Sequence, residues 1–412
     1  KYWKDRGRKL YDEWKPRLKV SGEVKQTAAT VMEDAKTDDD KLQRLFHYCR
    51  ASIKNINDAG SGLSAEKRNS AKENKVPADT IKQGMGTGTD INLLFAALAT
   101  AAGFDARMAW VADRSKFFFT PKTPTGWFLR ASEVAVQVDG KWKFFDPAST
   151  YVPYGRLRWQ EENTAALITD PKDPEFVVTP IAAPESSRRE RTGRFTLKGD
   201  GELEGDIVIQ DTGHEAVDRR RSYQGEEAGK REQNFIDSWK HQLGESEITN
   251  VKFDNLIDPD KPLIVSFHLK LPGYAQRTGK RMFMQASFFT KNLQTMFPAG
   301  ERRYPVYFAY PWSEKDHVEI GIPDGYDFDS PDMPSGLTLG DTGYWRAKAG
   351  INRSTHTLIY DREFAFGGGG KLLYPVESYP TMKKVFDAIA KSDEHAFSLK
   401  LATAAVPTGT GR

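Results

Sequence analysis

Residues 84–112 read GMGTGTDINLLFAALATAAGFDARMAWVA. The glycine-rich segment 84–89 leads into residues 90–102, where apolar side chains recur at helical spacing. Gly103 is well placed to end that helix, and residues 105–112 have the composition of a strand. The stretch therefore predicts a loop, a largely apolar helix and a strand in direct succession.

Flanking patterns place this helix in an α/β unit. Residues 41–52 carry apolar side chains on one helical face, which predicts an earlier helix. Residues 54–82 are polar and irregular, and we expect an exposed loop there. Downstream, residues 133–138 and 141–145 are joined by an Asp-Gly pair, which predicts a β-hairpin.

The second half of the chain reads as strand-rich. Helices are predicted at 229–243 and 380–391. Alternating segments separated by turn residues suggest a β-sandwich. The predicted strands are 251–253, 263–271, 304–310, 318–322, 354–360 and 397–402.

The segment 181–194 has lost all apolar periodicity, and we predict a linker there. The expected organisation is thus a first domain over residues 1–180 and a C-terminal β-rich domain over residues 195–412.

Length and composition exclude several classes of protein. The chain has 412 residues, which suits two or three domains. Its 60 basic and 57 acidic residues leave a formal net charge of +3, which gives no electrostatic argument for a nucleic-acid partner. The longest apolar stretch, 91–104, is too short to span a bilayer. Cys49 is the single cysteine, which excludes an internal disulfide and a cysteine zinc cluster.

No cofactor or metal is predicted from the motifs. The glycine-rich segment 84–89 is not followed by the Gly-Lys-Ser/Thr of a phosphate loop. The histidines from His214 onward show no metal-ligand spacing.

The order of the motifs resembles that of bacterial secreted transglutaminase-like proteins, the group usually carrying an N-terminal β-sandwich domain of unknown function. In that family the core reads roughly Gly-Asp-Cys-Lys-Asp, an apolar helix, Ala-Gly-Ile-x-Ala-Arg, a Phe-Asn-His strand and Trp-x-x-Leu-Asp-Pro. The matching stretches here are 86–90, 93–98, 102–107 and 139–147. The family's upstream sandwich is not recognised, and the chain opens at Lys1 without a methionine, so we expect a processed chain or a fragment.

The resemblance implies an α+β fold, with a papain/transglutaminase-like core followed by a mainly antiparallel β-sandwich domain. Residues 302–306 and 322–326 resemble parts of the β-domain that follows the core in the same family.

In such enzymes a cysteine at a helix N-terminus is activated by the helix dipole and a histidine, and an aspartate orients the histidine. With both ends of the predicted helix fixing the register, the resemblance puts Gly88 at the cysteine position. The histidine position falls on Ala131, or on Ser132 if the register slips by one. Only Asp146 of the three remains, so we expect a degenerate triad and no catalytic residue.

Other nucleophiles and bases nearby favour structural roles. His47 and Cys49 lie on the early helix, where packing is the simpler interpretation. Thr87 and Thr89 flank the glycine but have no visible base to activate them. We expect Asp90 to cap the first turn of the helix.

The altered site can still form a cleft. Without an imidazole partner, Asp146 should take a hydrogen bond from a backbone amide, Arg130 or ordered water. We expect Trp127 and Phe128 to fill the space, with a cleft open to a peptide-like ligand as the alternative. The cleft candidates are Thr87, Thr89, Asp90, Trp127, Phe128 and Arg130.

The sequence therefore favours a catalytically inactive transglutaminase-like protein acting as a binding or structural module of the bacterial cell envelope or exterior. The periplasmic or extracellular location is implied by the resemblance alone. A protein or peptide partner is expected, with neither nucleic acid nor a membrane span. The alternative is an active transglutaminase or cysteine-peptidase-like enzyme with displaced catalytic residues, which would bring a cysteine, a histidine or an activated hydroxyl close to Asp146.

Overall fold

The computed structural model describes residues 1–330 and 336–402, which fold into two compact units. The first unit comprises residues 1–182 together with the short segments 216–225 and 257–261. The second unit takes the rest of the chain. Each unit contains its own β-sheets and its own hydrophobic cores.

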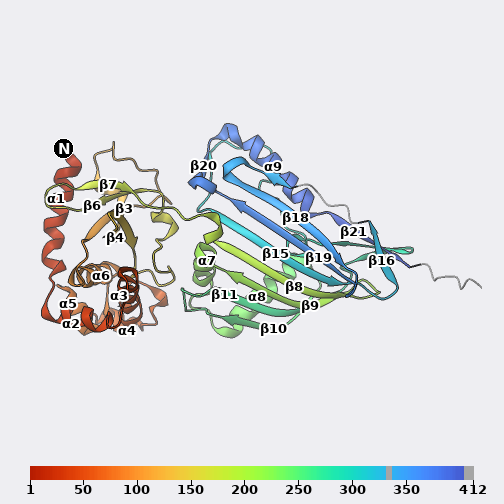
Figure 1. Cartoon of the computed structure of the whole chain (residues 1–412), viewed down its shortest axis with the longest axis horizontal. Helices are drawn as coiled ribbons and strands as arrows, with labels where there is room; N and C mark the ends of the chain where they lie inside the picture. Colours follow the sequence, from red (N-terminus) through yellow and green to blue (C-terminus); the bar gives the residue numbers. More distant parts are fainter. Residues whose placement is uncertain (331–335, 403–412) are drawn as a thin grey trace, which may run out of the picture. The chain divides into compact units, whose positions relative to one another are not determined.

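The first unit is built on a five-stranded antiparallel sheet with the order β5-β4-β3-β6-β7 (Figure 1). The predicted hairpin is present, and its turn residues Asp139 and Gly140 both have positive φ, as a tight two-residue turn requires. The strands are β3 (Ala106–Ala112), β4 (Leu129–Val138), β5 (Lys141–Phe145), β6 (Ala165–Ile168) and β7 (Glu175–Val178).

Helix α6 (Gly88–Ala101) is the predicted apolar helix, and it lies at the centre of the core of this unit. A capping box holds its start, because Thr87 accepts from the backbone N–H of Asp90 and Asp90 accepts from that of Thr87. Its end is a Schellman motif, in which Gly103, at φ 93°, and Phe104 donate to the carbonyls of Thr100 and Ala99.

Residues 1–182 form five further α-helices, of which α2, α3 and α5 contact α6 and α1 contacts the edge strand β7. The segment 54–82, expected as an exposed loop, contains two of them and a short strand, so that prediction is wrong in part. Local caps explain this, since Ser64 caps α4 and Pro77 occupies the first turn of α5. The additional elements are α1 (Tyr2–Trp14), α2 (Gly22–Val31), α3 (Asp38–Ser52), α4 (Ala65–Asn69), α5 (Pro77–Gln83), β1 (Lys54–Asn55) and β2 (Met85–Gly86).

The second unit contains an eight-stranded sheet with the order β10-β11-β9-β8-β15-β19-β18-β17. All neighbours are antiparallel except β8 and β15. Its strands are β8 (Arg188–Leu197), β9 (Leu203–Asp211), β10 (Glu247–Asp254), β11 (Leu263–Leu271), β15 (Trp312–Gly321), β17 (Leu337–Thr338), β18 (Gly343–Asn352) and β19 (Thr357–Phe366).

A four-stranded sheet with the order β12-β13-β21-β16 shares one hydrophobic core with the large sheet and with helix α8. Buried residues alternate with less buried ones along β11 and β15, so one face of the large sheet packs in this core. The remaining elements of this unit are α8 (Ala228–Leu243), α9 (Tyr379–Asp393), β12 (Gln276–Thr278), β13 (Arg281–Gln285), β14 (Val306–Tyr307), β16 (Tyr326–Ser330), β20 (Leu373–Tyr374) and β21 (Ala396–Leu401). Helix α7 (Gly213–Tyr223) begins in this unit, and its residues from 216 onward belong to the first.

Both helices predicted in the second half are present as α8 and α9. The predicted strands 251–253 and 263–271 fall inside observed ones, and 318–322, 354–360 and 397–402 overlap them. Residues 304–310 contribute only the two-residue β14, and several strands, among them β9, β13, β16 and β18, were not predicted.

The predicted linker at 181–194 is wrong. Residues Arg188–Leu197 form β8, which pairs with β9 on one side and β15 on the other in the middle of the large sheet. The main division between the two units comes after residue 182, close to the predicted end of the first domain at residue 180, but the segments 216–225 and 257–261 of the first unit were not predicted.

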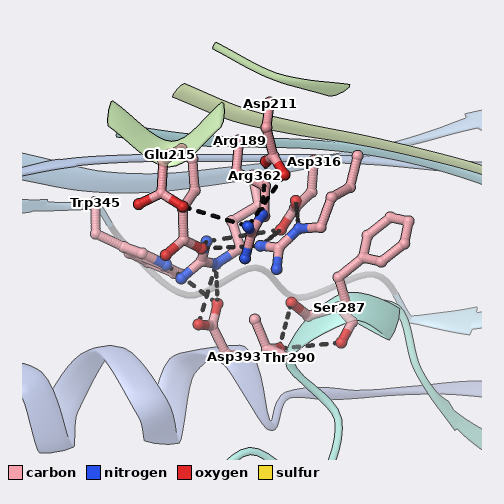
Figure 2. A network of polar contacts seen from close by, with 12 residues as sticks. Arg189, Asp211, Glu215, Ser287, Thr290, Asp316, Trp345, Arg362 and Asp393 are labelled. Atoms are coloured by element: carbon pink, nitrogen blue, oxygen red, sulfur yellow. Dashed lines mark hydrogen bonds and ion pairs between the residues drawn. The ribbon is translucent and has the colours of Figure 1, made fainter. Parts of the chain in front are cut away.

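A buried ionic network explains why such a charged strand can lie inside a sheet (Figure 2). Arg191, Asp316 and Arg362 are direct neighbours across β8, β15 and β19. The Nε of Arg191 lies 2.6 Å from one oxygen of Asp316. Arg362 donates from Nε to Asp393 at 2.8 Å and from Nη1 to Glu314 at 2.9 Å. Each guanidinium therefore meets carboxylates in a desolvated setting.

Within residues 1–330 and 336–402, no helix combines the length and the apolar composition that crossing a lipid bilayer needs.

Candidate functional site

Gly88 is the first residue of α6, where the resemblance places the lost cysteine. Its φ is not in the left-handed region, so the backbone does not demand glycine there. A Cβ added at Gly88 would lie 3.4 Å from the Cβ of Ala148 and 3.4 Å from Nδ2 of Asn55. A Cβ therefore fits at this position in close van der Waals contact with both neighbours.

Of the two candidates for the histidine position, Ser132 is the one that faces α6. It shares the face of β4 with Val134 and Val136, which pack in the core around the helix. The Oγ of Ser132 lies 3.2 Å from Oγ1 of Thr89 on α6. Ala131 packs with Ala109 and Val111 on the opposite face of the sheet.

Asp146 follows β5, is 3% exposed, and has new partners. Nδ2 of Asn92, on α6, donates to its Oδ1 at 3.1 Å, and the hydroxyl of Ser149 donates to its Oδ2. Nε of Arg158 lies 4.0 Å away. Asp146 does have hydrogen-bond donors, but they are the side chains of Asn92 and Ser149 and not the backbone amide or Arg130 that we expected.

These residues share a pocket of about 230 Å³ within the first unit. Its lining is mostly polar and contains neither a cysteine nor a histidine among the residues that the structure describes. The lining residues are Asn55, Asn57, Thr87, Gly88, Thr89, Asn92, Ala131, Ser132, Glu133, Asp146, Ala148, Ser149 and Arg158. Glycine, alanine and hydroxyl side chains thus line the place where the resemblance expects a thiol and an imidazole.

Three buried carboxylates lie together beside this pocket, and two of them, Glu133 and Asp146, line it. Glu133, Asp146 and Glu161 each offer an oxygen within 4.8 Å of the others. Burial, with the charges of Asp146 and Glu161 added, raises the pKa of Glu133 well above its usual range. Burial also raises the pKa of Glu161, to about 7, although Arg158 opposes the shift.

Arg158 is the counter-charge of this cluster. Its guanidinium donates to both carboxylate oxygens of Glu161, from Nε at 3.1 Å and also from Nη2. No described residue, in contrast, donates to Oε2 of Glu133, which is fully buried. The cluster is therefore only partly satisfied by the protein itself.

The residues that the sequence analysis proposed for a cleft do not all lie at one site. Thr87 and Thr89 line the pocket at Gly88. Asp90 is buried beside them, caps α6 and pairs with Arg17 at 2.8 Å, as its predicted capping role requires.

Trp127 and Phe128 do not fill the pocket, so that expectation is wrong. Trp127 is 55% exposed and lines a separate groove with Arg130, whose guanidinium carbon lies 5.6 Å from the Trp127 ring. Phe128 stacks on Phe119 at a centroid distance of 5.4 Å. The aromatic residues prefer one another to the polar pocket, since its lining offers little apolar surface to cover.

His47 and Cys49 lie outside the pocket. Nδ1 of His47 is 2.9 Å from Nη2 of Arg50 and 3.4 Å from Oδ2 of Asp260, and burial lowers its pKa. Cys49 is fully buried in the core around α6, and this burial raises the pKa of its thiol. Neither side chain is placed to serve Asp146.

Sequence reasoning missed Glu133, Arg158 and Glu161. A signal for Glu133 exists, because it shares a strand face with Ala131 and Ala135, and a carboxylate among small apolar residues is unusual on a buried face. Glu161, in a 3-10 turn after an irregular stretch, carries no comparable local signal.

Comparison with known proteins agrees with this architecture. Residues 25–147 match a family profile described as the transglutaminase-like superfamily, and residues 280–399 match a domain of unknown function, DUF3858. No curated protein matches the chain.

Among solved structures, the crystal structure of "a putative protease from Parabacteroides distasonis" is similar, with a TM-score of 0.50 and 11% sequence identity. The similarity covers 96% of this chain and 59% of that chain, and at this identity it supports the fold alone. The chain therefore carries a transglutaminase-like superfamily core, which includes the pocket at Gly88, followed by a β-rich domain that contains DUF3858.

Proposed function

We propose that this protein is a catalytically inactive transglutaminase-like protein that acts as a binding or structural module. The observation that carries the proposal is the lining of the pocket at Gly88. A glycine stands at the N-terminus of α6, Ser132 faces it from β4, and Asp146 is bonded to Asn92 and Ser149. A nucleophile without a base in reach has no means of activation.

The same pocket is proposed as the ligand site. It combines about 230 Å³ of space with hydroxyl, amide and carboxylate side chains, which suit a polar or peptide-like ligand. The bacterial cell envelope or exterior is proposed as its setting, on the strength of the family resemblance.

An activity assay tests the first part of the proposal. The full chain should neither incorporate a dansylated amine into a glutamine-containing protein nor cleave unstructured peptides. Turnover that disappears in Ser132→Ala or Thr89→Ala, and persists in the exposed control Thr123→Ala, would show an enzyme built on the hydroxyl pair and would end the inactive interpretation.

A binding assay tests the second part. Photo-crosslinking to envelope fractions, with the wild-type chain and with Ser132→Phe, asks whether the pocket captures a ligand. We expect the wild type to form a crosslinked product. The variant should not form it, because the phenylalanine ring fills the pocket. Equal crosslinking of both chains would place the interaction elsewhere.

A further inference from the structure

The feature that remains unexplained is the charge of the carboxylate cluster at the pocket, in which Glu133 and Asp146 line the pocket and Glu161 lies against them. Glu133, Asp146 and Glu161 are 2%, 3% and 0% exposed, and Arg158 is the cation that contacts the group. If all three carboxylates were ionised beside one guanidinium, two negative charges would remain uncompensated in a buried cluster. Such an imbalance is costly unless protons or a cation compensate it.

We propose that Glu133, Asp146 and Glu161 form a binding site for a hard divalent cation of the class of Mg²⁺, Mn²⁺ or Ca²⁺. The donors are all carboxylate oxygens, which these ions prefer, and one oxygen of each residue lies within 4.8 Å of the others. A charge of two positive units would balance the group.

A second observation points to a ligand independently of the clustering. Oε2 of Glu133 is buried and receives no hydrogen bond from the described residues, although the residue itself is 2% exposed and lines the pocket. A native protein rarely leaves such an acceptor unpaired. A cation at the floor of the pocket would take this oxygen as a ligand.

The other two carboxylates retain capacity to coordinate. A carboxylate has about four lone-pair sites. Asp146 uses one for Asn92 and one for Ser149, and Glu161 uses two for Arg158. Space for water ligands exists as well, because the pocket holds about 230 Å³ and a water molecule occupies roughly 30 Å³.

Arg158 does not block the site. Its side chain is 37% exposed, so it can turn partly toward solvent when a cation takes over its role. This inference shares a pocket with the proposed function, but it does not depend on catalytic inactivity and is tested without any substrate.

The test is a titration of the full chain with Mn²⁺ alone. Binding is measured as the loss of the free-ion signal in electron paramagnetic resonance. We expect one Mn²⁺ per chain, displaced by Mg²⁺ or Ca²⁺. Glu133→Gln keeps the shape of the side chain and removes its charge, and it should weaken binding about tenfold or more. The control Glu66→Gln, an exposed acid of the same unit, should bind Mn²⁺ like the wild type.

Asp146→Asn is the second variant, in case Glu133→Gln does not fold. Anomalous scattering from a crystal grown with Mn²⁺ gives a readout that needs no variant, and it should place the ion between Glu133 and Asp146. The inference is overturned if the wild type binds no Mn²⁺ at millimolar concentration, if both variants bind it unchanged, or if the ion lies elsewhere.

Discussion

Replacing Arg362 by methionine tests the buried network of the second unit. Arg362 is 5% exposed and bonds to Asp393 and Glu314, with Asp316 at 3.6 Å. Methionine fills similar space without charge, so the change chiefly removes the cation. The change leaves buried carboxylates without their cation. Removing one partner of a buried ion pair is strongly destabilising because the remaining charge is uncompensated.

The expected loss in the free energy of unfolding is about 3–5 kcal/mol. Glu314 gives an independent figure. Burial by itself would raise its pKa, but the charges of Arg362 and Arg191 outweigh burial and lower the pKa from 4.5 to about 2. That difference corresponds to about 3 kcal/mol at neutral pH, as an upper limit because the Glu314 side chain is 26% exposed and partly screened.

The pH dependence follows from the sign of that shift. A lowered pKa contributes stability above about pH 4.5, and the contribution is lost as the pH falls toward about 2. In Arg362→Met one of the two cations that bond to Glu314 is absent, and Arg191 remains. The difference between wild type and variant should therefore be largest near pH 7 and shrink below pH 4.5.

Native-state hydrogen exchange measures the free energy of unfolding of the second unit, and it does not require both units to unfold together. Peptides from β19, Thr357–Phe366, should exchange faster in Arg362→Met by the factor that about 3–5 kcal/mol implies. Arg346→Met is the matched control, because Arg346 on β18 is 58% exposed and pairs with Glu363, the residue next to Arg362 on β19. It should cost less than about 1 kcal/mol. A loss at Arg362 no larger than that of the control, or one that grows in acid, would refute the reasoning.

Four other outcomes are expected. Cys49 should react with a thiol reagent only after denaturation, since it is buried and its pKa is raised; rapid labelling of the folded chain would contradict the fold around α6. A thiol introduced by Gly88→Cys should label quickly in the same assay, because it lies at a helix N-terminus in the pocket, and a labelling rate as slow as that of Cys49 would count against this placement. Trypsin should spare residues 188–194 despite their four arginines, and early cleavage there would argue against β8. Thr87→Ala should cost about 1 kcal/mol by removing the N-cap of α6, measured by thermal unfolding, whereas no change would mean that the capping box is dispensable.

Short-range sequence signals were enough to predict α6 and the β4–β5 turn of the first unit. The glycine-rich entry, the apolar run and Gly103 define α6 from nearest-neighbour effects, and Asp139-Gly140 fixes the β4–β5 turn. These signals act over a few residues, so a single sequence carries them. The resemblance to transglutaminase-like proteins, placed on this register, pointed to Gly88 and Asp146, which the structure brings to one pocket.

Choices that depend on the pairing of distant strands were decided only by the tertiary structure. Sequence left the histidine position open between Ala131 and Ser132, and the pairing of β4 with β3 settled which of the two faces α6. Glu133 and Glu161 are 28 positions apart in sequence numbering and become neighbours only when the unit closes.

The segment 188–194 shows the same limit most clearly. Its arginines read as a solvated linker, because a buried charge is unfavourable unless it is paired and nothing nearby in sequence pairs these. The partners of Arg191 are Asp316 and Glu314, more than a hundred residues away, and they reach it because β8 and β15 lie side by side. Whether a charged segment is a linker or a central strand is thus decided by where its counter-charges fold, since long-range ion pairing leaves no local pattern.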